Sequence, residues 1–175
     1  MPYEEYSFAR EGGDHTIAYL SRPVFELAGG IGRETRVLDV GCGNGYWAGL
    51  FLEPGCTVVG IDLSASGNEI ARRAHPRGRF ELLPADDQLL ERLVEKPFDL
   101  LLSTEVLEHL YSPRSYASGC FEALRPGGRI VCTTPYHGYL KNLAISMAAS
   151  GIGMQIRSGI AGTLSCGAAA RCHAF

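Results

Sequence analysis

The stretch "VLDVGCGNGYW" (residues 37–47) decides the fold. Its first half is a short apolar, β-branched run that ends in glycine, which is typical of a buried strand. Three alternating glycines, Gly41, Gly43 and Gly45, follow it and allow a sharp turn of the backbone. Residues 45–53 then carry apolar side chains at helical spacing. The stretch therefore predicts a strand, a glycine turn and a helix.

The same strand-then-helix unit repeats along the chain. Further strands are predicted over residues 56–63, 79–84, 98–106 and 129–135. Further helices are predicted over residues 64–75, 86–96 and 112–128. Because strands alternate with helices, the connections are expected to be right-handed crossovers between parallel strands. The sequence therefore predicts an α/β fold with a doubly wound, mostly parallel sheet.

Capping and packing details follow from the helix patterns. Ser64 is expected to cap the helix over 64–75. Ser112 is expected to cap the helix over 112–128, with Pro113 in its first position and Pro-Gly-Gly at its end. The residues expected to face inward from the helix over 86–96 are Leu89, Leu90, Leu93 and Val94.

Composition limits the classes of protein that this chain can represent. With 175 residues, 46% of them hydrophobic, the chain can bury one core but not two. A formal net charge of −3 gives no electrostatic support for binding nucleic acid or an anionic membrane surface. The acidic N-terminus lacks the apolar region of a secretory signal, and no stretch reaches the roughly 20 apolar residues of a membrane span.

Six cysteines are present, and none forms a Cys-x-x-Cys pair. Four of them lie in apolar segments, where a free cysteine behaves as a small hydrophobic residue. This pattern favours a reducing compartment and predicts a cytoplasmic protein. Near the C-terminus, Cys166, Cys172 and His173 offer too few ligands for a four-ligand zinc site, so no metal is expected.

The residues after the first predicted strand indicate the kind of ligand. In an open α/β sheet, ligands bind beyond the carboxyl ends of the strands, where the strand order reverses. The glycine spacing is G-x-G-x-G rather than the G-x-G-x-x-G of pyrophosphate-binding folds. Asp39 stands two residues before Gly41, where a carboxylate would repel a pyrophosphate but attract an ammonium group. The expected ligand therefore carries an amino acid group rather than a polyphosphate.

Acidic residues at the ends of the next two strands indicate which other groups this ligand carries. Asp62 ends the second strand and can accept hydrogen bonds from both hydroxyl groups of a ribose. Asp86 and Asp87 follow the third strand and can accept hydrogen bonds from an adenine amino group. A nucleoside joined to an amino acid without phosphate describes S-adenosyl-L-methionine, which is the predicted cofactor.

Four segments resemble the successive motifs of class I S-adenosylmethionine-dependent methyltransferases. They are "VLDVGCGNGYW", "VVGIDLS", "FDLLLSTEVLEHL" and "LRPGGRIVCTTPYHGYLKNLAIS". The subgroup they are most similar to is that of the ubiquinone-biosynthesis O-methyltransferases, and the resemblance covers residues 30–146. It implies a Rossmann-like methyltransferase fold for this region and a small-molecule methyl acceptor. The cofactor-binding residues that it implies are Asp39, Gly41, Cys42, Gly43, Asp62, Leu63, Asp86 and Glu105.

Each of these positions also has a purely structural interpretation. Asp39 could accept hydrogen bonds from local backbone, and Asp62 could form a turn at a strand end. Asp86 stands where a helix begins, so the helix dipole alone would favour an acid there. The neighbouring Asp87 is interpreted as the cap of that helix rather than as a ligand-binding residue, and Cys42 as a residue chosen for its size.

Methyl transfer to a hydroxyl group needs a base, and His109 is the candidate. It lies four residues after Glu105, so on a helical turn the two side chains would share a face. Glu105 could then orient the imidazole ring. The alternative is that His109 is a surface residue near the end of a helix.

Two further segments are expected to border the acceptor. Residues 1–29 are predicted to form a lid over the cofactor that carries His15. Tyr136, His137 and Tyr139 follow the fifth strand and are expected to line the acceptor pocket.

The final segment, residues 147–175, has no periodic pattern and is predicted to be an aberrant, disordered tail. Members of the family usually add two strands after the fifth, and the expected fold lacks them. The fifth strand is then expected to be an exposed edge. When residues from 151 on are back-translated and read in another frame, they can give "LWDxGHIKxWS", which resembles the subgroup's continuation. We therefore expect a truncated or frameshifted gene, and the source nucleotide sequence tests this.

Three functions remain open from sequence. The first is a methyltransferase acting on a small molecule, with O-methylation of a phenol or quinone precursor as the expected reaction. The second is a non-catalytic, cofactor-binding fragment of such an enzyme. The third is an NAD-dependent oxidoreductase, which the glycine spacing and Asp39 disfavour.

Overall fold

The computed structural model describes residues 15–134, 154–156 and 161–165. The helices are α1 (His15–Ala28), α2 (Tyr46–Leu52), α3 (Ala65–Ala74), α4 (Leu89–Leu93) and α5 (Pro113–Ala123), with a short 3-10 helix η1 (Leu107–His109). The strands are β1 (Arg36–Val40), β2 (Thr57–Asp62), β3 (Arg79–Leu82), β4 (Phe98–Thr104), β5 (Leu124–Thr133), β6 (Met154–Ile156) and β7 (Ala161–Ser165).

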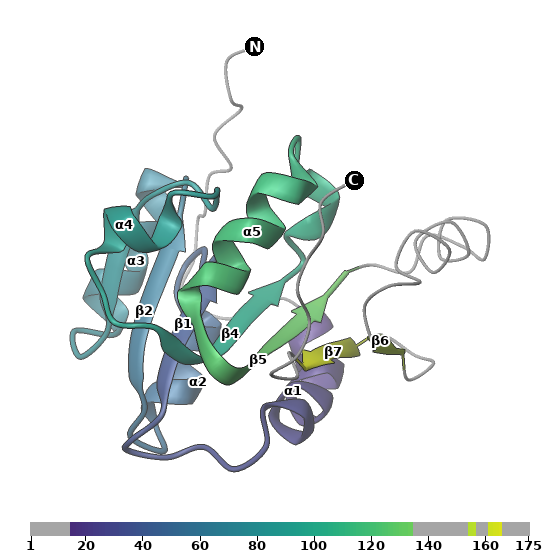
Figure 1. Cartoon of the computed structure of the whole chain (residues 1–175). Helices are drawn as coiled ribbons and strands as arrows, with labels where there is room; N and C mark the ends of the chain where they lie inside the picture. The colour runs from purple at the N-terminus through teal and green to yellow at the C-terminus, as the bar shows by residue number, and fades with distance from the viewer. Residues whose placement is uncertain (1–14, 135–153, 157–160, 166–175) are drawn as a thin grey trace.

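These strands form one sheet in the order β3-β2-β1-β4-β5-β7-β6 (Figure 1). β1 pairs in parallel with β2 on one side and with β4 on the other. The strand order therefore reverses between β1 and β4, as the doubly wound prediction requires. Because the first five strands are parallel, their carboxyl ends meet at one edge of the sheet, which we call the carboxyl edge.

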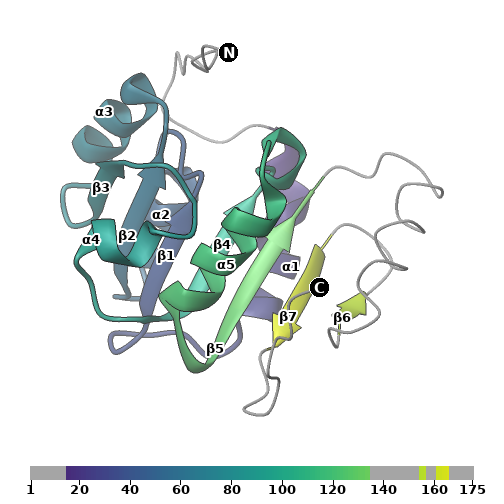
Figure 2. The same ribbon diagram turned by 45° about the horizontal axis from the view of Figure 1, so that its top comes forward.

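Helices cover both faces of the sheet, and each face has its own core (Figures 1 and 2). On one face, α1, α2 and α3 pack against the sheet, with Trp47 and Phe51 of α2 among the buried residues. Phe25 of α1 stacks on Phe51 with ring centroids 4.9 Å apart. On the other face, α4 and α5 pack against the sheet through residues such as Leu89 and Tyr116. The apolar face predicted for residues 45–53 is confirmed, since Trp47 and Phe51 are buried.

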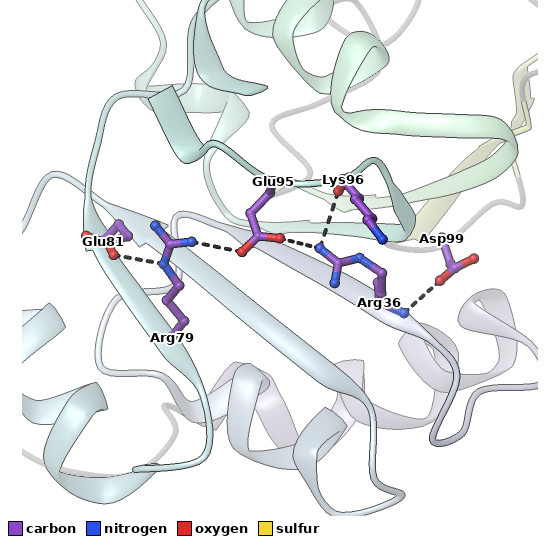
Figure 3. A network of polar contacts seen from close by, with 6 residues as sticks. All are labelled: Arg36, Arg79, Glu81, Glu95, Lys96 and Asp99. Atoms are coloured by element: carbon purple, nitrogen blue, oxygen red, sulfur yellow. Dashed lines mark hydrogen bonds and ion pairs between the residues drawn. The ribbon is translucent and has the colours of Figure 1, made fainter. Parts of the chain in front are cut away.

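The amino ends of the strands are joined by a network of ion pairs (Figure 3). Glu95 contacts Arg36 at 2.5 Å and Arg79 at 2.8 Å. Arg79 also contacts Glu81, and the backbone N–H of Arg36 donates to Asp99 at 2.7 Å. The Arg36 guanidinium lies 5.1 Å from the centre of the Phe98 ring. Ion pairs between oppositely charged side chains therefore connect neighbouring strands at this amino edge of the sheet.

The structure corrects the prediction that the fifth strand is an exposed edge. β7 pairs antiparallel with β5 from Arg129↔Ser165 to Thr133↔Ala161, and β6 pairs antiparallel with β7. Residues 154–156 and 161–165 of the predicted tail are therefore part of the sheet rather than disordered. The physical reason is that backbone N–H and C=O groups at a sheet edge pair with an extended segment almost independently of its side chains.

Two local predictions were also wrong. Val94 does not face inward: it ends α4 in a left-handed conformation and is 86% exposed. The helix predicted over 112–128 ends at Ala123, and the segment with Pro-Gly-Gly belongs to β5, whose pairing with β4 is irregular there. Ser112 is the N-cap residue of α5 and Pro113 its first residue, as predicted, although the Ser112 side chain makes no capping hydrogen bond. By contrast, the predicted cap of α3 is confirmed, since Ser64 Oγ accepts from the Gly67 N–H at 3.1 Å.

The N-terminal helix is part of the core where its side chains are described. Leu20, Val24 and Ala28 of α1 are fully buried on the α2 face, whereas Tyr19 is half exposed. The lid role of residues 1–29 stays a prediction. None of the helices in the described part of the chain combines the length and apolar character that crossing a membrane requires.

Candidate functional site

The glycine turn after β1 is held against the end of β2. The backbone N–H groups of Gly41 and Cys42 both donate to the carbonyl of Ile61, at 2.8 and 3.0 Å. The Gly45 N–H donates to the carbonyl of Cys42 at 2.8 Å and closes the turn. The three alternating glycines all have positive φ, at 75° (Gly41), 51° (Gly43) and 81° (Gly45). The predicted need for glycine at these positions is therefore confirmed.

Gly41 also leaves room for a neighbouring strand end. A Cβ on Gly41 would lie 2.3 Å from Cγ2 of Val106, which follows β4. The end of β4 therefore approaches the end of β1 as closely as a residue without a side chain allows. Since β1 and β4 flank the reversal of strand order, this contact marks the place where an α/β sheet binds its ligand.

Among the described residues, Asp39 is a buried carboxylate without a hydrogen bond of ordinary geometry. It is 1% exposed, and neither of its oxygens has a partner that meets this criterion. Burial, and secondly the nearby Asp62 carboxylate, raise the pKa of Asp39 to about 7, while the Ala48 N–H acts in the opposite direction. The local backbone therefore does not satisfy this carboxylate. Unpaired buried carboxylates are rare because the ionised form is costly to bury.

Asp62 is held with its carboxylate facing the glycine turn. One oxygen accepts from the Gly43 N–H at 2.8 Å and the other from the Ser64 N–H at 2.7 Å. Asn68 donates to the backbone carbonyl of Asp62 at 3.1 Å. The turn-forming interpretation is thus realised, but each carboxylate oxygen keeps a second lone pair that could accept from a ligand.

Asp86 carries a different set of contacts. Both of its oxygens accept from Nη1 of Arg92, at 2.8 and 2.7 Å, and one also accepts from the Gln88 N–H at 3.0 Å. The hydrogen bond from Arg92 is the main cause of a lowered pKa for Asp86. Asp87 does not cap α4: the N-cap residue is Gln88, and it is Asp86 that accepts the local backbone N–H. The interpretation of Asp87 as the cap is therefore wrong.

Cys42 and Leu63 flank this arrangement. The Cys42 side chain is buried, and a Cβ on Gly60 of β2 would lie 2.9 Å from its sulfur. This contact supports the interpretation of Cys42 by size. Leu63, directly after Asp62, is 41% exposed, which is unusual for a leucine beside a buried strand. In the described part of the chain, Cys42, Cys56, Cys120 and Cys132 are all free thiols.

Glu105 occupies a strained backbone position at the end of β4. Its φ is 57°, which is unusual for a residue with a side chain. The Glu105 N–H donates to the carbonyl of Thr133 at 3.1 Å, and Thr133 Oγ1 donates to Glu105 Oε1 at 2.9 Å. Strain of this kind tends to lie at functional sites. Here two hydrogen bonds between Glu105 and Thr133 of β5, one in each direction, stabilise it.

The predicted pairing of Glu105 with His109 on one helical face is wrong. Glu105 lies outside η1 in a left-handed conformation, so the four-residue helical spacing does not apply. His109 Nε2 lies 3.9 Å from Oε1 of Glu108 instead, and Thr134 Oγ1 donates to the other Glu108 oxygen at 3.2 Å. The Glu108 side chain is only 12% exposed, whereas that of His109 is 78% exposed. Sequence reasoning missed Glu108 because no periodic pattern distinguishes it from its neighbours.

Several predicted site residues lie outside the described residues. Tyr136, His137 and Tyr139 fall in the segment 135–153, and the side chain of His15 is likewise outside the described part. The same holds for Cys166, Cys172 and His173. Within the described residues, no group of three His, Cys, Asp or Glu side chains could hold a metal ion.

Known proteins share this sequence pattern. The first curated relative is a ubiquinone biosynthesis O-methyltransferase of Dinoroseobacter shibae, 38% identical over 57% of this chain and 40% of the relative. A second, from Mycolicibacterium smegmatis, is named "Probable S-adenosylmethionine-dependent methyltransferase" and is 36% identical over 75% of this chain and 46% of the relative. The chain thus spans less than half the length of the curated relatives it matches.

A solved structure and a protein family agree with these relatives. The crystal structure of an S-adenosylmethionine-dependent methyltransferase from Mesorhizobium loti is 28% identical, with a TM-score of 0.57 over 80% of this chain and 60% of that one. The family described as "Methyltransferase domain" matches residues 13–154. The Rossmann-like fold predicted from sequence is therefore confirmed, and the chain belongs to the S-adenosylmethionine-dependent methyltransferases.

Proposed function

We propose that this chain binds S-adenosylmethionine at the carboxyl edge of its sheet and transfers the methyl group to a hydroxyl group of a small aromatic molecule. The acceptor class is a phenol or quinone precursor, and its support is the similarity to ubiquinone biosynthesis O-methyltransferases. The four free cysteines of the described residues support a reducing, cytoplasmic setting.

The buried carboxylate of Asp39 is the observation that carries this proposal. An ammonium group beside the glycine turn would give its two unpartnered oxygens the charge-assisted hydrogen bonds that they lack. A pyrophosphate would instead add negative charge next to Asp39 and Asp62. The acceptor groups of the site therefore fit the amino acid end of S-adenosylmethionine and do not fit a dinucleotide.

The remaining cofactor contacts follow the order of the strands. Gly41, Cys42 and Gly43 border the amino acid end, where a side chain at Gly41 would collide with Val106. Asp62 accepts from the ribose hydroxyl groups through the lone pairs that its backbone contacts leave. Leu63 offers an exposed apolar surface to the base, and the loop with Asp86 borders the base from the side of β3.

The cofactor supplies a methyl group on a positively charged sulfur, which is a good leaving group, so most of the acceleration comes from positioning. The chain's own residues position the acceptor and remove its proton. Glu105 holds the end of β4 in its strained conformation beside Val106, next to the glycine turn. Nε2 of His109, which lies 3.9 Å from Oε1 of Glu108, takes the proton of the acceptor hydroxyl. Tyr136, His137, Tyr139 and His15 are proposed as acceptor contacts.

Calorimetry followed by a methyl-transfer assay tests this function. We expect the purified chain to bind S-adenosylhomocysteine and not NAD. With radiolabelled S-adenosylmethionine we expect label in a catechol acceptor, and a His109→Gln variant that binds the cofactor normally but transfers the label at least about tenfold more slowly.

Two other outcomes would contradict the proposal. Binding of NAD alone contradicts the proposal and favours an oxidoreductase. Binding of S-adenosylhomocysteine without transfer to any phenol contradicts the proposed reaction and favours a cofactor-binding fragment.

A further inference from the structure

Helix α5 contains a glycine whose missing side chain is occupied by the loop between β3 and α4. A Cβ on Gly119 would lie 1.9 Å from the carbonyl oxygen of Asp86 and 2.7 Å from its carbonyl carbon. An ordinary carbon–oxygen contact is about 3.3 Å or longer, so any side chain here would displace this backbone by about 1 Å or more. Glycine inside a helix is less favourable than alanine, so its presence here favours a packing role.

A second residue of the same helix holds the same loop. The backbone N–H of Asp87 donates to Oγ of Ser115 at 3.2 Å, one helical turn before Gly119. Ser115 and Gly119 are four residues apart and therefore lie on one face of α5. This face thus contacts two successive residues of the loop through their backbone.

Contacts with α4 hold the loop on its other side. The carbonyl of Asp86 accepts from the Leu89 N–H at 3.1 Å, and its carboxylate is clamped by Arg92 of α4. Leu89 and Leu93 of α4 are fully buried against the sheet. Two helices therefore fix the backbone position of Asp86 and Asp87 at the carboxyl end of β3.

We propose that Gly119 and Ser115 are positioning residues that set the adenine specificity of the cofactor site. They do so by holding the loop at residues 86–87 at one distance from the base. The inference rests on the proposed function, because it assumes that this loop borders the adenine ring. Carboxylates in the loop accept from a 6-amino group but repel the 6-oxo group of hypoxanthine, so the loop position determines how strongly the two bases are distinguished.

The test compares two ligands that differ only along the edge of the base that carries the 6-amino or the 6-oxo group. We measure the affinities of the full chain for S-adenosylhomocysteine and S-inosylhomocysteine by calorimetry. The wild-type chain is expected to prefer the adenine ligand by about tenfold or more, which corresponds to about 1.4 kcal/mol. Gly119→Ala moves the loop and is expected to reduce the preference to less than about threefold, mainly by weakening binding of the adenine ligand.

A matched pair in the same helix gives the control. Ser115→Ala removes the hydroxyl that accepts from Asp87 and is expected to reduce the preference in the same direction. Ser118→Ala makes the same change where the hydroxyl donates to the exposed Glu122 at 3.4 Å, and it should leave the preference unchanged. This pair keeps the inference testable if Gly119→Ala does not fold.

The outcomes separate the inference from the function on which it rests. If the wild-type chain binds neither ligand, the proposed function fails and the inference fails with it. If the wild-type chain prefers adenine and both Gly119→Ala and Ser115→Ala keep that preference, only the inference is overturned. An equal loss of affinity for both ligands would mean that the two residues serve stability alone, and it would also overturn the inference.

Discussion

The pKa values of carboxylates are shifted in opposite directions at the two edges of the sheet. At the amino edge, burial alone would raise the pKa of Glu95, but hydrogen bonds and charge from Arg36 and Arg79 more than offset this and lower it. The pKa of Asp99 is lowered in the same way by Arg36 and Arg125, against the effect of burial. At the carboxyl edge, burial and the nearby Asp62 carboxylate raise the pKa of Asp39 to about 7, and the Ala48 N–H offsets only part of this rise.

This difference separates groups that stabilise the fold from groups held ready for a ligand. A chain selected for stability alone would pair Asp39 or replace it, since an unpaired buried acid weakens the folded state. The strained backbone of Glu105 lies at the same edge, and strain of this kind also indicates a functional site. We propose that the amino edge supports the fold, while the carboxyl edge gives up stability to bind a cationic group.

The largest expected effect is a loss of stability with rising pH. The folded-state pKa of Asp39, about 7, lies above its ordinary value of 3.8, so its contribution to stability is present below pH 3.8 and is lost as pH rises through 7. We expect the free energy of unfolding to fall by roughly 2 to 3 kcal/mol between about pH 5 and pH 8.

Urea denaturation across this pH range measures the effect. Asp39→Asn should remove the slope, because the amide does not titrate. The lowered pKa values of Glu95 and Asp99 act only at more acidic pH, so the amino edge cannot produce this slope. A slope that persists in Asp39→Asn would break the proposed contrast between the edges.

A smaller effect is expected at the contact between β1 and β4. Gly41→Ala forces a side chain into a left-handed conformation and against Val106. We expect a loss of about 2 kcal/mol in stability, together with weakened binding of S-adenosylhomocysteine. Thermal unfolding and calorimetry measure the two effects, and unchanged binding would mean that the turn does not border the cofactor.

The smallest effect is expected at the amino edge. Glu95→Gln removes the charge that joins Arg36 and Arg79, whose side chains are 28% and 44% exposed. Because solvent screens these pairs, we expect a loss of only about 1 kcal/mol in stability and no change in cofactor binding. Glu26→Gln is the matched control, since Glu26 pairs with the highly exposed Arg22 and should show no measurable loss. Equal losses in both variants would contradict a supporting role for the amino edge.

Much of this arrangement could be predicted from local patterns. The strands, the glycine turn and the cap of α3 follow from runs of a few residues, and Asp39 and Asp62 stand out because an acid at a strand end is visible in one dimension. The face of α5 that holds the loop could not be derived, because the contact of Gly119 joins segments more than 30 residues apart. Its one visible signal was an isolated glycine inside a helical pattern.

The failures have identifiable physical causes. The pairing of Glu105 with His109 assumed a helical turn, but the chain leaves β4 through a left-handed residue that no propensity favours. The composition of the tail led to the prediction that the edge of β5 is exposed. Pairing of β5 with β7 depends instead on backbone groups that every sequence shares.

Calorimetric titration of S-adenosylhomocysteine into the wild-type chain and Asp39→Asn at about pH 8 tests the central claim most directly. The claim is that the unpartnered carboxylate of Asp39 is kept for the ammonium group of the cofactor. We predict that the wild-type chain binds and that Asp39→Asn binds about 10- to 100-fold more weakly, the loss expected for one hydrogen bond to a charged group. Equal affinities of the two proteins would contradict the claim.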